Sequence, residues 1–348
     1  MSNFAPFNDI SDFSFYKPGI SEFGIHAILI FSDNGLPILS RYYTQNPKNN
    51  DQDFLIISAF ISSLRHFIQA QNDDIFTDFG MGQIRYYIKI HGDKIYCLIL
   101  SEIISRRITG ESLTSLLELT LNQLIKSFTV YYQMTKTKDY LQLHYVDHFV
   151  FQIDTVLFLN FKNAINELTE INRDKKRQFD NFKVFYNNSD RYTEINHQLL
   201  IKGIQGLIIF ENESNPLIVR DYALERETFN IDYYSGLSLA TKKFAHYNLG
   251  VLTDIGLGNS RIMVKNKDGL VICLIISEVL YWRITGEILS IFMEMTISDI
   301  LRSFNLYLDM FNYSKKGFLD DDTLQVFNEQ IDLLLLENAK VALKELNN

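Results

Sequence analysis

The chain has 348 residues, of which 47% are hydrophobic and 22% are charged. This length and composition exclude an intrinsically disordered chain and leave room for two domains, each with its own hydrophobic core. The net charge of −9 argues against a nucleic-acid-binding protein, because such binding depends on clustered Lys and Arg side chains that neutralise phosphates.

The first predicted elements form a β-hairpin followed by a helix. A strand over 27–31 meets an Asp-Asn-Gly turn that begins at Asp33, which is a strong hairpin signal, and a second strand follows over 37–43. Apolar residues with helical spacing come next. They are Phe54, Ile57, Ile61, Leu64 and Ile68.

The next predicted elements are strands, and helices follow them. A Thr-Asp-x-Gly-x-Gly motif that begins at Thr77 is expected to form a short strand ending in a Gly-rich turn, before strands over 84–90 and 95–100. Thr109 is a good N-cap for the amphipathic helix that follows, and a final helix is expected over about 150–168. The predicted order is β-β-α-β-β-β-α-α.

This set of elements occurs twice, because the chain contains an internal repeat. The segment that begins at Phe76 aligns without a gap to the segment that begins at Leu252, and the run Arg-Ile-Thr-Gly-Glu at 107–111 recurs at 283–287. The identical pairs include Thr77/Thr253, Asp78/Asp254, Gly80/Gly256, Gly82/Gly258, Arg85/Arg261, Cys97/Cys273, Ser101/Ser277 and Glu102/Glu278. We therefore expect two units, 1–175 and 196–348, joined by a polar linker over 176–195.

The cysteines and the apolar runs favour a cytoplasmic location. Cys97 and Cys273 occupy equivalent places in strand-like apolar runs, so we expect a buried thiol in each core rather than a disulfide. No apolar run approaches the roughly 20 residues of a transmembrane helix, and no N-terminal secretory signal is recognisable.

The element order and the opening hairpin, Ile-Phe-Ser-Asp-Asn-Gly-x-Pro-Ile from Ile30, resemble the longin domain and the related Roadblock domain. The resemblance is better to longin, because two helices follow the last strand, whereas a Roadblock domain begins with a helix. The segment 190–201 could be such a helix in the second copy. The segment 16–23 is not expected to be helical, because it contains Pro18 and Gly19.

The resemblance implies an α+β fold, layered as α/β, of two tandem longin-like units. Each unit would be a five-stranded antiparallel sheet flanked by helices. The resemblance also implies that the protein acts in complexes that control small GTPases, vesicle tethering or vesicle coats. Tandem arrangements of this kind are similar to the longin cores of small-GTPase regulators and to longin proteins of archaea related to eukaryotes.

No motif in the sequence predicts an active site, a cofactor or a metal. The Gly-x-Gly motifs at Gly80 and Gly256 lack the third glycine and the following helix of a phosphate-binding loop, so we interpret them as structural turns. His144 and His148 have a spacing that can hold a metal on one helical face, but no third ligand is evident and the second copy lacks both. We expect no enzymatic activity.

Arg107 and Arg283 stand at equivalent places in the predicted loop between the last strand and the next helix. An arginine supplied to a GTPase can stabilise charge on a transferring phosphate. The interpretation we favour is structural, with each guanidinium pairing with a nearby glutamate: Glu102 or Glu111 in the first copy, Glu278 or Glu287 in the second.

The second copy becomes apolar at positions that are polar in the first. Ser105, Arg106, Ser112 and Ser115 are replaced by Tyr281, Trp282, Ile288 and Ile291. With Met295, these residues form a candidate interface, because Trp and Tyr commonly anchor interfaces. The sequence leaves open whether the first copy or a partner covers this face.

The leading functional hypothesis is a non-enzymatic regulatory scaffold that associates with a small GTPase, its regulatory complex or another longin or Roadblock protein. The first alternative is a structural subunit of a coat or tethering assembly. The second is a small-molecule sensor of the PAS or GAF type, although bulky strand residues argue against a ligand cavity. The sequence leaves open whether the chain forms a homo- or hetero-oligomer.

Overall fold

The structure is a computed structural model. The residues that it describes are 17–44, 51–71, 75–101, 111–135, 148–166, 203–211, 216–222, 233, 236–237, 251–267, 270–283, 286–310 and 321–345. The chain divides into two compact units, called unit 1 (residues 1–59 and 84–178) and unit 2 (residues 60–83 and 179–348). The predicted linker lies outside the described residues, so the boundaries at 175 and 196 stay predictions.

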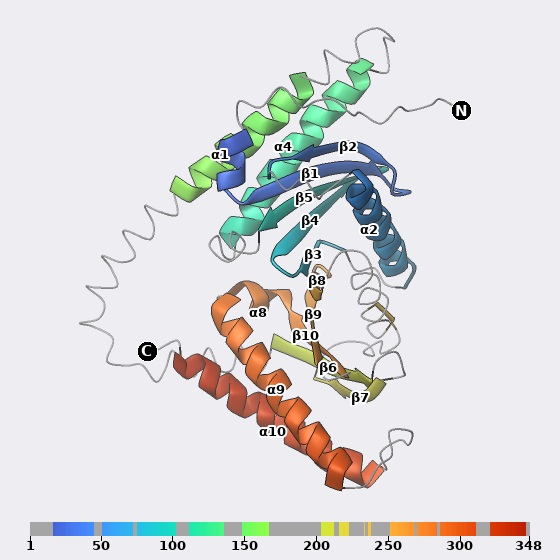
Figure 1. The fold of residues 1–348 in the computed structure, drawn as a ribbon, viewed down its shortest axis with the longest axis vertical. Coiled ribbons are helices and arrows are strands. Elements are labelled where there is room, and N and C mark those ends of the chain that lie inside the picture. Colours follow the sequence, from blue (N-terminus) through green and yellow to red (C-terminus); the bar gives the residue numbers. More distant parts are fainter. Residues whose placement is uncertain are drawn as a thin grey trace, which may run out of the picture. The chain divides into compact units, whose positions relative to one another are not determined.

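Unit 1 contains a four-stranded antiparallel sheet in the order β2-β1-β5-β4. The strands are β1 (Ile25–Ser32), β2 (Pro37–Tyr42), β4 (Ile84–His91) and β5 (Lys94–Ser101). Helix α4 (Glu111–Thr135) and a helix over 148–166 lie along one side of the sheet, while the unit 1 part of α2 (Asp51–Gln71) lies along the other (Figure 1). Helix α2 begins in unit 1 and ends in unit 2.

The described part of unit 2 contains six antiparallel strands in the order β3-β8-β9-β10-β6-β7. They are β3 (Asp78–Met81), β6 (Ile204–Glu211), β7 (Pro216–Asp221), β8 (Leu252–Gly256), β9 (Ser260–Lys267) and β10 (Leu270–Ser277). The helices are α8 (Glu278–Arg283), α9 (Gly286–Met310) and α10 (Asp321–Glu345). Apolar side chains of α9 and α10 pack together with those of the strands in one core.

The described strands of the two copies have the same order and register. In unit 1, Cys97 on β5 stands between Leu29 and Ile88. In unit 2, Cys273 on β10 stands between Ile208 and Val264. Neither cysteine is in a disulfide and both are fully buried, as the sequence predicts. The predicted mixed α+β class with an antiparallel sheet is confirmed.

Strand β3 belongs to the first sequence copy but pairs with β8 of the second. The pairing is antiparallel, with Phe79 opposite Ile255, Asp78 opposite Gly256 and Gly80 opposite Asp254. Equivalent residues are therefore related by a local twofold arrangement about the central pair. Four of the five strands predicted for the first copy lie in unit 1, and the short one lies in unit 2.

The expectation that 16–23 is not helical is wrong, because α1 spans Lys17–Glu22. Pro18 lies in the first turn of α1, where a proline is tolerated because the backbone N–H groups lack intrahelical acceptors. Gly19 allows close packing, since a Cβ atom there would lie 2.8 Å from Cε2 of Phe158.

The segment after β10 also differs from the prediction, because it forms the short helix α8 rather than a loop. The side-chain oxygen of Ser277 accepts a hydrogen bond from the backbone N–H of Leu280, at 3.2 Å, and so caps the helix. Leu280 is buried against Gly203, where a Cβ atom would lie 2.7 Å from the leucine side chain. Arg283 is the last residue of α8.

Candidate functional site

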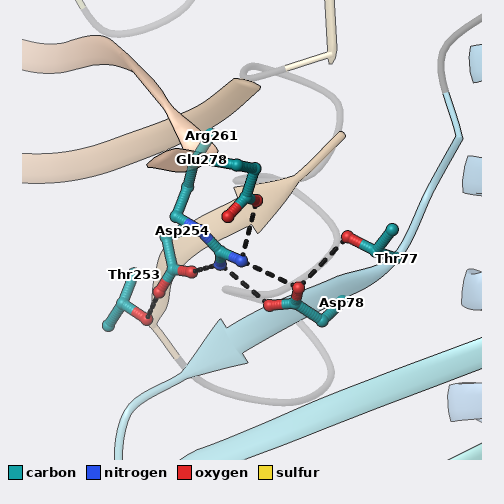
Figure 2. Close-up of polar contacts among 6 residues, drawn as sticks. All are labelled: Thr77, Asp78, Thr253, Asp254, Arg261 and Glu278. Atoms are coloured by element: carbon teal, nitrogen blue, oxygen red, sulfur yellow. Dashed lines mark hydrogen bonds and ion pairs between the residues drawn. The ribbon is translucent and has the colours of Figure 1, made fainter. Parts of the chain in front are cut away.

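Charged residues that the two copies share meet at the β3–β8 pairing. Thr77 and Asp78 come from the first copy, and Thr253, Asp254, Arg261 and Glu278 come from the second; we call these six residues the Arg261 cluster (Figure 2). All of them lie in unit 2. Asp78 and Arg261 are separated by 183 positions in the sequence.

Two aspartates bind the guanidinium group of Arg261. Its Nη1 atom donates to Oδ1 of Asp78 and its Nη2 atom donates to Oδ2, both at 2.8 Å, which is a bidentate ion pair. The Nη1 atom also donates to Oδ1 of Asp254. One guanidinium group therefore joins a strand of the first copy to a strand of the second (Figure 2).

Two threonines repeat the local twofold arrangement. The hydroxyl of Thr77 donates to Oδ2 of Asp78 at 3.2 Å, and the hydroxyl of Thr253 donates to Oδ2 of Asp254 at 3.0 Å. In each copy, the threonine hydroxyl thus donates to the carboxylate of the aspartate that follows it. The Thr-Asp identity between the copies is explained by this shared role.

Glu278, at the start of α8, is the third carboxylate near Arg261. Its Oε1 atom lies 3.0 Å from Nη2 of Arg261. Among the residues that the structure describes, neither of its carboxyl oxygens accepts a well-aligned hydrogen bond. Burial raises the pKa of Glu278 to about 7, and the charges of Asp78 and Asp254 act in the same direction, whereas Arg261 opposes them.

Arg261 is fully buried and remains positively charged. Burial alone would lower its pKa, but the negative charges of Asp78, Glu278 and Asp254 outweigh that effect and hold the pKa well above the usual arginine range. The ring of Tyr281 on α8 lies 3.9 Å from the guanidinium carbon, which is a cation–π contact. Arg85, the repeat equivalent on β4, is also buried, at 1% exposure.

Because Gly256 has no side chain, the Arg261 cluster can pack directly against its backbone. A Cβ atom at this position would lie 2.6 Å from Oδ2 of Asp78, 2.7 Å from the Thr77 hydroxyl and 2.8 Å from Nη2 of Arg261. Gly80 and Gly256 lie within strands, while Gly82 and Gly258 form the turns with φ angles of 59° and 77°. The structural interpretation of the Gly-x-Gly motifs accounts for these positions, although Gly256 also serves the ion pairs.

A second polar set occurs once in each unit. In unit 1, Arg41 forms a bidentate ion pair with Asp154, and the hydroxyl of Tyr43 donates to Oδ1 of Asp154 at 2.8 Å. In unit 2, Arg220, Tyr222 and Asp332 repeat these contacts. The side chains of Arg41 and Asp154 are 5% and 4% exposed, whereas those of Arg220 and Asp332 are 28% and 41% exposed.

The structure describes only part of the predicted interface. Tyr281 is half-buried beneath Arg261, Met295 is half-buried, and Ile291 is 38% exposed on α9. The side chains of Trp282 and Ile288 lie outside the described residues, as does the side chain of Arg283 and all of Arg107. The roles predicted for the interface residues and for the two arginines stay predictions.

Of the two histidines with metal-ligand spacing, the structure describes one. His148 is exposed and contacts Gln152, at 3.2 Å, and His144 lies outside the described residues. Within the described ranges, no group of three His, Cys, Asp or Glu side chains could hold a metal ion. In the same ranges, no helix has the length and apolarity needed to cross a membrane.

The Arg261 cluster was not predicted as a site, although its members stand among the repeat identities. The signal that could have found it is a pair of charged residues, Asp and Arg, inside otherwise apolar strands of both copies. Chemically, the guanidinium forms ion pairs with the carboxylates inside the fold. This arrangement favours a structural joint over a reaction centre, because a catalytic group must reach a substrate.

No family model matches this sequence, and no curated protein matches it either. Among solved structures, the chain is similar to a chain in a homology model of the full-length AP-3 complex in a stretched open conformation. That match has 15% identity and a TM-score of 0.25, and it covers 45% of this chain and 98% of the other. The chain is also similar to MglB with a tetrameric arrangement, with 9% identity, a TM-score of 0.21, and coverage of 47% and 99%. At these scores, neither similarity carries an argument about function.

Proposed function

We propose that this protein is a non-enzymatic interaction scaffold made of two longin-type copies. Its partner is a small GTPase or the regulatory complex of one, in a trafficking-like system. The proposal combines the longin-like order of the elements with the way the shared charged residues are used.

The Arg261 cluster is the observation that supports the scaffold role most. Asp78, Asp254 and Arg261 are each less than 5% exposed, and the guanidinium of Arg261 binds both aspartates. The residues that the copies share therefore contribute to the association of β3 with β8. A scaffold needs a firm joint of this kind, whereas an enzyme needs polar groups that open to a substrate.

The packing of the sheets favours a scaffold over a small-molecule sensor, which requires a cavity. Tyr86, Tyr96 and Ile272 are at most 5% exposed, and the ring of Tyr96 lies 5.9 Å from that of Phe128 in an edge-to-face contact. Met263 packs against the core of unit 2. Side chains fill the sheet faces at these bulky positions.

Binding to small GTPases tests the proposal. The purified chain is immobilised, and small GTPases captured from native lysate of the source cells are purified, loaded with GDP or a non-hydrolysable GTP analogue, and measured by biolayer interferometry. We expect the affinity to depend on the nucleotide. Trp282→Ala, on the predicted interface, is expected to weaken binding by about 2 kcal/mol or more, as interface anchors do.

Phe151→Ala serves as the matched control, because Phe151 is 52% exposed on a helix of unit 1 and lies outside the predicted interface. This variant is expected to bind as the native chain does. Binding to coat or tether subunits without any nucleotide dependence would favour the alternative role. Failure of every loaded GTPase to bind would contradict the proposal, as would hydrolysis of GTP by the chain alone.

A further inference from the structure

Helix α8 is connected to the joint between β3 and β8 through a single charged group. Arg261 contacts Asp78 on β3 and Asp254 on β8, and it also contacts Glu278 and the ring of Tyr281 on α8. The backbone N–H of Glu278 donates to the carbonyl of Asn259, at 3.1 Å, in the turn before β9. The position of α8 therefore depends on the charges around Arg261.

The charge of Glu278 is poorly compensated by its surroundings. Its side chain is 12% exposed, and Asp78 and Asp254 already bind the same guanidinium. Glu278 lies at ion-pair distance from Arg261, yet neither of its oxygens accepts a well-aligned hydrogen bond among the described residues. An ionised carboxylate in this place is desolvated and repelled by two neighbouring carboxylates.

We propose that uptake or loss of a proton by Glu278 changes how firmly α8 is held against the sheet of unit 2. When Glu278 is neutral, Arg261 binds Asp78 and Asp254. Helix α8 then packs through Leu280 and Tyr281 without repulsion between Glu278 and the aspartates. When Glu278 is ionised, the cost of desolvation and repulsion from the two aspartates outweigh its attraction to Arg261 and weaken the attachment of α8. This inference goes beyond the proposed function and does not depend on a partner.

The pKa of Glu278 sets the pH range of the effect. Burial, aided by Asp78 and Asp254, raises the pKa to about 7 from the usual 4.5, so the folded chain holds this proton at pH values where the unfolded chain has lost it. The stability that Glu278 contributes is therefore fully present below about pH 4.5 and is lost as the pH rises through about 7. Near neutral pH, both forms of Glu278 are populated.

The chain carries its own probe of α8, because Trp282 is its only tryptophan and lies on that helix. Acrylamide quenching of Trp282 fluorescence is measured in the native, full-length chain between pH 5.5 and pH 8.5. We expect quenching to increase with pH, in one transition with its midpoint near pH 7. A native chain whose quenching stays constant across this range would overturn the proposal.

Glu278→Gln tests whether Glu278 causes the transition, because the amide keeps the shape of the side chain and removes its titration. The variant is expected to show the low quenching of the acidic state at every pH and to melt at a higher temperature than the native chain at pH 8. Glu294→Gln is the matched control, since Glu294 is 58% exposed on α9 and pairs with Lys265 on the surface. A transition that persists in Glu278→Gln, or disappears in Glu294→Gln, would contradict the assignment.

Discussion

Replacement of Arg261 by methionine is expected to lower the free energy of unfolding by about 3–5 kcal/mol. The guanidinium is fully buried and binds Asp78 and Asp254, so methionine would remove its ion pairs with two carboxylates in the interior. The loss of free energy comes mainly from these lost ion pairs, because a methionine side chain can fill much of the vacated space. Urea unfolding followed by circular dichroism measures the change.

Lys265→Met is the control for this experiment. Lys265 lies on the same strand, β9, and pairs with Glu294, but the two side chains are 39% and 58% exposed. Surface ion pairs of this kind contribute about 0–1 kcal/mol, so the control is expected to unfold almost as the native chain does. Equal losses for the two variants would mean that burial of the Arg261 cluster has no energetic consequence.

Replacement of Asp154 by alanine is expected to destabilise unit 1 by about 3–5 kcal/mol, because the buried Arg41 would lose its bidentate ion pair with Asp154. The Tyr43 hydroxyl would lose its acceptor as well. The equivalent change in unit 2, Asp332→Ala, is expected to cost about 0–1 kcal/mol, because Arg220 and Asp332 are partly exposed to solvent. The two substitutions remove the same contacts and differ mainly in burial.

Thermal unfolding of both variants distinguishes these effects. A clearly lower melting temperature for Asp154→Ala than for Asp332→Ala is the expected result. If Asp332→Ala proved equally damaging, the difference in solvent exposure between the two polar sets would not control their energetics.

The local elements were predictable because their signals are local. The hairpin around Gly35 follows from its Asp-Asn-Gly turn, and Gly35 has the positive φ angle of 80° that favours glycine. The buried strands of Cys97 and Cys273 follow from continuous apolar runs. Helix α1 was missed because Pro18 was read as a helix breaker, although the first turn of a helix accepts proline.

The residues of the Arg261 cluster carry a signal in the sequence, but the contacts between them could not be predicted from it, for a different reason. Asp78 and Arg261 are 183 positions apart, and no local periodicity indicates that β3 pairs with β8. The repeat showed that the same charged residues occur in both copies, but not that an aspartate of one copy binds the arginine of the other. Contacts of this kind depend on how the strands associate, which the pattern within each copy does not encode.

A double-mutant cycle on Asp78 and Arg261 tests most directly the claim that the shared charged residues join the two copies. The free energy of unfolding is measured for the native chain, Asp78→Asn, Arg261→Met and the double variant. We expect a coupling energy of about 2 kcal/mol or more, because each single change removes the bidentate ion pair between these two buried side chains. Effects that add within about 0.5 kcal/mol would contradict it, since the two side chains would then act independently.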